Sequence, residues 1–241
     1  MTSASPSSRP VLLRATARHR IGVAYAVAPD RLAPHLPGGL VPDVHEGAAY
    51  LSLVGVHLME MRVLGLKGPG LRHVPAVELQ AAVQQEDTAH RGTYTLQAYV
   101  PRRLVAWGAR ALYDEPVDTA SMQPVHRTPD GRVEMTYRFD WQGQEQRLRV
   151  VGDRGESEAA ADGLVPFVRE RPWRFSGGDG SLHRAHLQRP DGSARTAHTA
   201  HVTVQWRSAF GDVGEVLRDR TPAGAWIGPE GALALRWRAS V

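Results

Sequence analysis

Residues 74–115 read VPAVELQAAVQQEDTAHRGTYTLQAYVPRRLVAWGARALYDE, and this stretch decides the fold. Its apolar, β-branched and aromatic residues predict two strands, at 76–85 and 93–100, because such side chains favour a half-buried pleated surface. The polar segment EDTAHRG between them predicts the connecting turn. Residues 102–114 then predict a helix with one apolar face, formed by Leu104, Trp107, Ala111 and Leu112. We expect this strand–turn–strand–helix unit to line a pocket.

One carboxylate, Glu78, interrupts the otherwise neutral first strand of this unit. If Glu78 is buried, desolvation raises its pKa, and a carboxyl group with a raised pKa suits a general acid or base. The alternation of the strand equally allows Glu78 to lie on a solvent-facing side with Gln80. Glu78 is therefore the candidate catalytic residue, and surface exposure is the open alternative.

Similar patterns continue on both sides of residues 74–115. Residues 48–63 predict a strand that is apolar on both faces, which is typical of a central position in a sheet. Residues 64–73 contain three glycines and a proline and predict a mobile loop of the kind that covers pockets. Strands are also predicted at 18–27, 117–126, 132–141, 144–151, 173–175, 181–188, 201–207 and 232–238, and short helices at 29–36 and 159–169. About ten short strands with few helices are typical of a single β-dominated barrel or sandwich.

Composition narrows the class of protein. The 241 residues are 42% hydrophobic and 22% charged, as in ordinary globular proteins. The segment MTSASPSSRP predicts a disordered tail over 1–10 without an export signal, and 11–241 are expected to form one domain. No apolar run is long enough for a membrane helix, and the absence of cysteine excludes disulfides and thiolate chemistry. We expect a cytoplasmic protein without a membrane partner.

The charge pattern argues against a nucleic-acid partner. The net charge is +4, and Lys67 is the only lysine among 29 basic residues. These residues are scattered among 25 acidic ones, whereas nucleic-acid-binding proteins concentrate positive charge on one face or helix. A mixed-charge solvated surface is the expected arrangement.

Two histidine pairs and Lys67 are the remaining candidates for chemistry. Two pairs have the H-x-x-H spacing: His183 with His186, and His198 with His201. On a helix, two histidines with this spacing can bind one metal ion, whereas on a strand their side chains point to opposite faces. Because both segments have strand character, we predict no metal and no cofactor, and a histidine-dependent metal hydrolase stays an alternative. Lys67 lies in the glycine-rich segment, where solvent exposure is expected to prevent imine formation.

A set of segments in a fixed order resembles a known family. The segments are YAVAPDRLAPHLPGGL, AAYLSLVGVHLMEMR, VPAVELQAAV, RLVAWGARALYDEP and LVPFVRERPWRF. They are similar to the YqjF-like proteins, an uncharacterised bacterial family with a domain of unknown function, from about Arg18 to Arg207. That family resembles acetoacetate decarboxylase. The resemblance implies a β-dominated α+β fold, one large antiparallel β-barrel or cone around a central pocket, with a few short peripheral helices.

The resemblance also implies which catalytic groups this chain has and lacks. Acetoacetate decarboxylases have a glutamate that opens a strand, and Glu78 takes that place. Their motif W/Y-G-F-P-K-K-L holds a Schiff-base lysine and a second lysine, and here Ala111 and Leu112 replace the two. The arginine that grips the substrate carboxylate in those enzymes falls near Ala26. Decarboxylation through a covalent imine is therefore not expected.

Together these features predict a protein that binds a small organic ligand in the barrel interior, with an oxo-acid as one candidate. Lyase- or isomerase-type activity without a Schiff base is left open, with Glu78 as the acid, base or hydrogen-bonding group. A non-catalytic binding or sensor protein is the alternative from another class, and homo-oligomerisation is left open. An anionic ligand is expected, and the ligand-binding residues that we predict are Arg72, His73, Tyr94, Trp107 and Arg110.

Overall fold

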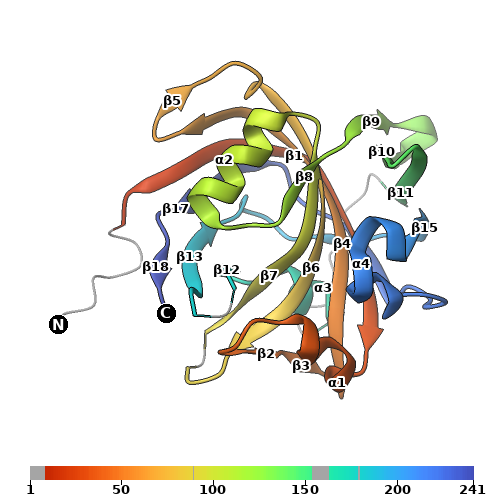
Figure 1. Cartoon of the computed structure of the whole chain (residues 1–241). Helices are drawn as coiled ribbons and strands as arrows, with labels where there is room; N and C mark the ends of the chain where they lie inside the picture. Colours follow the sequence, from red (N-terminus) through yellow and green to blue (C-terminus); the bar gives the residue numbers. More distant parts are fainter. Residues whose placement is uncertain (1–8, 89, 154–162, 179) are drawn as a thin grey trace.

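The computed structural model describes residues 9–88, 90–153, 163–178 and 180–241, and a 14-stranded sheet forms most of it (Figure 1). Seven of these strands close into a barrel, because β1 pairs with β17 on one side and with β4 on the other. In spatial order they are β1 (Val11–Val27), β17 (Gly231–Arg236), β13 (His183–Gln188), β12 (Trp173–Ser176), β7 (Arg91–Val100), β6 (His73–Gln85) and β4 (Ala48–Val63). Neighbours are antiparallel except β12 and β7. The predicted β-dominated barrel is confirmed.

Short elements extend the barrel, and a second sheet lies beside it. The extensions are β2 (Leu40–Pro42), β3 (Val44–His45), β5 (Leu66–Lys67), β8 (Val117–Thr119), β14 (Arg195–Thr196), β16 (Gly224–Ile227) and β18 (Ala239–Ser240). The second sheet contains β9 (Ser121–Arg127), β10 (Arg132–Trp141), β11 (Gln144–Asp153) and β15 (Thr199–Thr203). The helices are α1 (Pro29–Leu32), α2 (Arg103–Tyr113), α3 (Leu164–Arg169) and α4 (Trp206–Glu215), with 3-10 turns η2 (Ala33–His35) and η3 (Pro129–Gly131).

The strands β4 and β6 are buried on both faces. On one face, Leu53 and Leu79 pack into a core shared with Tyr137 of the second sheet. On the other face, Val54 and Glu78 point into the barrel, because successive side chains of a strand alternate between faces. This double burial explains the two apolar faces of residues 48–63, and the predicted central position of that strand is confirmed.

One end of the barrel is covered by α2, with the β4–β5 hairpin next to it, and α1, β2 and β3 lie at the opposite end (Figure 1). The helix predicted at 102–114 is confirmed by α2. Asp114 ends it in the left-handed conformation, with φ of 55°, and its N–H donates to the Arg110 carbonyl oxygen. This ending turns the chain into β8, which pairs with β7 and completes the wall of the barrel beside the helix.

The structure corrects the strands predicted at 117–126 and 201–207, and it contains short strands that were not predicted. The strand predicted at 117–126 is two strands, since β8 pairs with the barrel and β9 pairs with the second sheet. The strand predicted at 201–207 ends at Thr203, and Trp206 begins α4, whose Phe210 and Val213 pack into the shared core. The short strand β16 was not predicted, because four residues carry too little alternation to be recognised.

Parts of other predictions fall outside the described residues. The helix predicted at 159–169 is one of these, because residues 159–162 lie outside the described ranges. The helix α3 covers Leu164–Arg169. Residues 1–8 of the predicted tail also do so, whereas the carbonyl oxygens of Arg9 and Pro10 accept hydrogen bonds from Arg236 and Trp237. The division into a tail and one domain stays a prediction. None of the helices in the described ranges has the length and apolar character needed to cross a membrane.

Candidate functional site

A cavity of about 340 Å³ lies inside the barrel and extends to α2. Most of its wall is aliphatic and comes from β1, β4, β6, β7, β17 and α2. The charged or amide side chains that face it are Arg20, Glu78, Gln80, Glu115, Arg174 and Arg189. Ligand pockets in proteins commonly combine a largely apolar wall with a few convergent polar groups. This cavity is therefore the candidate functional site.

The strand register separates a polar floor from an apolar wall. Glu78 pairs across the sheet with Val54 of β4 and Ala98 of β7. Toward α2 and the β4–β5 hairpin, the next cavity-facing residues are apolar: Val56, Leu58, Val74, Ala76 and Val100. At about 3.3 Å per residue, Val74 lies about 13 Å along β6 from Glu78. Leu104 and Trp107 of α2 line the cavity and are 59% and 66% exposed, so they mark its mouth.

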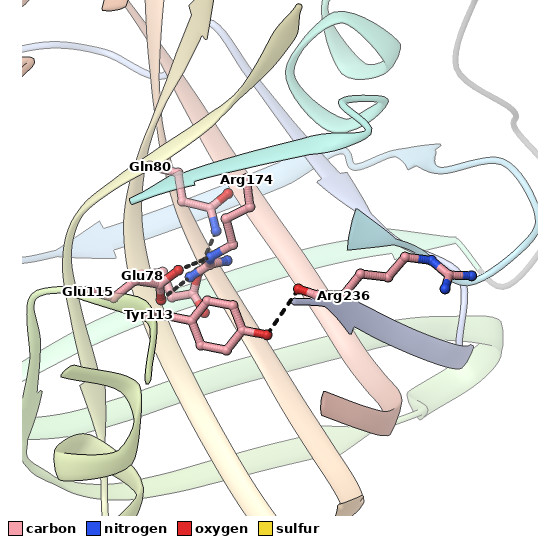
Figure 2. A network of polar contacts seen from close by, with 6 residues as sticks. All are labelled: Glu78, Gln80, Tyr113, Glu115, Arg174 and Arg236. Atoms are coloured by element: carbon pink, nitrogen blue, oxygen red, sulfur yellow. Dashed lines mark hydrogen bonds and ion pairs between the residues drawn. The ribbon is translucent and has the colours of Figure 1, made fainter. Parts of the chain in front are cut away.

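At the floor, Arg174 connects two carboxylates (Figure 2). Its Nη1 donates to Glu78 Oε2 at 3.1 Å, and its Nη2 donates to Glu115 Oε2 at 2.8 Å. Its Nε donates to the other oxygen of Glu115, and Gln80 Nε2 donates to Glu78 Oε2. The paired contact with Glu115 fixes the guanidinium plane, since two parallel hydrogen bonds allow one orientation. Tyr113 closes the group on the α2 side, and its hydroxyl donates to the Arg236 carbonyl oxygen at 3.3 Å.

This network reverses the pKa shift that we expected for Glu78. Burial by itself would raise the pKa of Glu78, but Arg174, the Gln80 hydrogen bond and nearby Arg20 outweigh burial and lower it. The predicted raised pKa is therefore wrong, and so is the alternative of a solvent-facing position, since the side chain is 13% exposed. At neutral pH Glu78 is a carboxylate, which accepts hydrogen bonds and does not donate a proton.

Two more guanidinium groups face the cavity without forming an ion pair with any described carboxylate. Arg20 is 6% exposed, lies 5.1 Å from the ring centroid of Trp226, and has no hydrogen-bond partner at Nη1. Arg189 donates from Nη1 to the Arg171 carbonyl oxygen and has an unpaired Nε. Burial lowers the pKa of Arg20 to about 10 and also lowers the pKa of Arg189. The lining thus has three guanidinium groups against two carboxylates, an excess of one positive charge.

Only part of the predicted set of site residues lies together. Glu78 and Trp107 line the cavity, and the other four predicted residues do not. Arg72 pairs with Glu60, Arg110 pairs with Asp118, His73 contacts Met59 Sδ at 3.3 Å, and the Tyr94 hydroxyl donates to the Gly177 carbonyl oxygen at 2.9 Å. The positive charge at the cavity comes from β1, β12 and the end of β13 instead.

Arg20, Arg174 and Arg189 were not among the predicted site residues. A signal for the first two exists, because Arg20 precedes the apolar run IGVAYAV and Arg174 lies between Trp173 and Phe175. A charged residue inside an apolar strand is the same signal that identified Glu78. The convergence of these residues depends on barrel closure, which pairs segments that are far apart in the chain.

Lys67 lies in β5, and its predicted solvent exposure is confirmed. The neighbouring Gly68 and Pro69 line the cavity, but Lys67 does not. As this is the only lysine of the sequence, the cavity lining contains no lysine amine.

The two H-x-x-H pairs lie on different sheets. His183 and His186 belong to β13 of the barrel, whereas His201 belongs to β15 of the second sheet and His198 Nε2 lies 2.7 Å from Asp153. Over the described ranges, no group of three or more histidine, aspartate or glutamate side chains is arranged to hold a metal ion. The metal-hydrolase alternative has no support from this geometry.

A profile of the family DUF2071, described as an uncharacterized conserved protein, matches residues 14–220. A search of curated proteins found no match to the chain. Among solved structures, an acetoacetate decarboxylase-like enzyme from Sphingomonas wittichii RW1 has a TM-score of 0.68 at 14% identity, covering 100% of this chain and 96% of that one. The enduracididine biosynthesis enzyme MppR, complexed with pyruvate, has a TM-score of 0.69 at 15% identity, covering 96% and 90%. Acetoacetate decarboxylase from Legionella pneumophila has a TM-score of 0.67 at 12% identity, covering 96% and 88%. These likenesses establish a shared fold and confirm the predicted resemblance.

Proposed function

Because the chain belongs to the DUF2071 family and its barrel cavity contains two guanidinium groups that form no ion pair with any described carboxylate, we propose that it binds a small organic anion inside the barrel. The main observation that supports this proposal is the excess positive charge of the cavity lining. A buried charge without a partner is costly, and a bound carboxylate supplies that partner with two acceptor oxygens. In this proposal Arg20 and Arg189 bind the anion in place of the predicted Arg72 and Arg110.

The proposed chemistry does not pass through an imine with lysine. Lys67 is outside the lining, and Ala111 and Leu112 stand where the resemblance implies a lysine pair. Both hydrogen bonds to Glu78 reach Oε2, so Oε1 is the oxygen that a ligand hydroxyl can approach. The lowered pKa makes Glu78 a weak base at neutral pH, which favours binding over turnover.

A lysine-independent lyase or isomerase is the second candidate function, because Glu78 lies at the floor of the cavity. The complex of MppR with pyruvate supports an oxo-acid as one member of the ligand class. We also propose that the protein is cytoplasmic, has no nucleic-acid partner and self-associates.

A thermal-shift screen with oxo-, hydroxy- and simple carboxylic acids tests the proposed binding. A ligand at 100 times its Kd stabilises the folded state by about 2.7 kcal/mol, so Tm rises with acid concentration. We expect the shift in the wild type and in Arg72→Met, whose arginine is exposed, and a loss of the shift in Arg20→Met. No shift with any acid, or a full shift in Arg20→Met, contradicts the proposal.

Borohydride reduction in the presence of pyruvate tests the proposed absence of imine chemistry. We expect no covalent adduct at Lys67 by mass spectrometry. An adduct on Lys67 would show that this loop reaches the ligand and would restore the Schiff-base mechanism.

A further inference from the structure

The cavity has more apolar wall than a small oxo-acid can cover. We propose that its ligand is an amphipathic monocarboxylate, with the carboxylate at Arg20 and Arg189 and an apolar chain or ring along the wall between β4, β6 and α2. This inference rests on the proposed function and names the ligand class of the same site.

The cavity is larger than a small oxo-acid. At about 30 Å³ for each water molecule, the cavity of about 340 Å³ holds roughly eleven groups of that size. Pyruvate has six non-hydrogen atoms and would leave much of the apolar wall in contact with water. An acid of about ten non-hydrogen atoms matches the volume, and its apolar part gains free energy as it leaves water.

The polar and apolar side chains of the lining occupy different parts of the cavity. All six charged or amide side chains of the lining belong to the floor, whereas the wall toward the mouth is aliphatic or aromatic. A ligand with a second anionic group would bury that group against aliphatic side chains, at a large desolvation cost. One anionic group also matches the single excess positive charge of the lining.

The apolar face of α2 is largely exposed where it lines the cavity. In this helix only Ala106 and Tyr113 are buried, although the apolar face lines the cavity from Leu104 to Leu112. Leu104 and Trp107 are mostly exposed, so none of the described residues covers this part of the helix. An apolar chain that extends from the floor to the mouth would cover it.

Calorimetric titration with butanoate, hexanoate, octanoate and decanoate tests the inference at constant pH and salt. Each added methylene is expected to raise the affinity about 4-fold, which corresponds to about 0.8 kcal/mol. The gain is expected to level off between octanoate and decanoate, when the cavity is full. Octan-1-ol, which has the same chain without the charge, should bind more weakly than octanoate and should lose nothing in Arg20→Met.

A pair of tryptophan variants locates the chain. Trp107→Ser removes an exposed side chain at the mouth and should weaken octanoate several-fold while butanoate changes little. Trp237→Ser is the matched control, because Trp237 is also exposed, at 39%, and does not line the cavity.

The outcomes separate the inference from the proposed function. If butanoate and octanoate bind equally and both depend on Arg20, the amphipathic ligand is wrong and anion binding stands. If octan-1-ol binds as tightly as octanoate, the assignment of the carboxylate to Arg20 and Arg189 is overturned. If none of the acids binds, including the small oxo-acids of the thermal-shift screen, both proposals fall.

Discussion

The Glu78 carboxylate is buried, yet two donors keep it ionised. Arg174 and Gln80 both donate to its Oε2, and these contacts outweigh the desolvation that would otherwise raise its pKa. A carboxylate whose pKa is lower in the folded than in the unfolded state stabilises the protein above the unfolded pKa. That stabilisation is lost as the pH falls through the folded pKa.

Glu78→Gln should therefore destabilise the protein by about 1.5–3 kcal/mol at pH 7, the usual cost of losing a hydrogen bond to a charged group. The difference from the wild type should shrink as the pH falls below the ordinary glutamate value of 4.5. Urea unfolding at a series of pH values between 7 and 3 measures it. Glu60→Gln removes an exposed partner of Arg72 and should show little difference at any pH. A pH-independent loss in Glu78→Gln would contradict the lowered pKa.

For single residues, the sequence identifies candidate site residues better than it identifies their ionisation state or their partners. Glu78 is conspicuous because it stands alone in a neutral strand, and Trp107 because it lies on an apolar helical face. The ionisation state of Glu78 depends on Arg174, 96 residues further along the chain, and no local pattern connects the two. Arg72 and Arg110 lie outside the cavity lining and pair with Glu60 and Asp118, and these partners are also set by the fold and not by a local pattern.

The two faces of β4 have different packing requirements. Gly55 lies on the face against the second sheet, where an added Cβ would lie 2.4 Å from the ring of Tyr137. The ring cannot easily yield, because Tyr137 is 1% exposed and its hydroxyl donates to the His19 carbonyl oxygen at 2.8 Å. The absence of a side chain at Gly55 therefore lets the second sheet approach the barrel closely.

Gly55→Ala should destabilise the protein by about 1–3 kcal/mol through overpacking. Gly108→Ala is the matched control: Gly108 is inside α2 with no atom near the added methyl group, and alanine should stabilise the helix by up to about 1 kcal/mol. Urea midpoints for the two variants should move in opposite directions. Equal stability of Gly55→Ala and the wild type would show that the sheets can separate without cost.

The elements with a strong pattern of their own were predictable, and those defined by partners were not. The strand at 48–63 has an apolar run on both faces, and its predicted range agrees with β4. In contrast, residues 117–127 form two strands because β7 takes Val117–Thr119 and β10 takes Ser121–Arg127, and the residue types do not mark the change of partner. The local preference of the α4 segment for helix is weak, and the burial of Phe210 and Val213 in the shared core stabilises the helix there.

At the scale of the whole molecule, one hydrophobic core joins the barrel to the second sheet. The cluster that contains Leu53 and Leu79 of the barrel also contains Phe139 and Leu148 of the second sheet. The barrel type could be inferred from the resemblance of ordered segments. The closure of β1 onto both β4 and β17 could not be inferred from alternation, because alternation specifies a face of a strand and not its neighbour.

A shared core implies that the two sheets unfold together. Leu148 is fully buried in β11, the strand that pairs with both β10 and β15, and Leu148→Ala should cost about 2–5 kcal/mol. If residues 11–241 form one domain, as predicted, this variant should lower the urea midpoint equally by two probes, far-ultraviolet circular dichroism and tryptophan fluorescence. Coincident transitions by different probes are the mark of two-state unfolding. The matched substitution in the barrel is Leu79→Ala, which should lower both midpoints in the same way. Two separated transitions in Leu148→Ala, with the later one at the wild-type midpoint, would show that the second sheet unfolds as an independent unit.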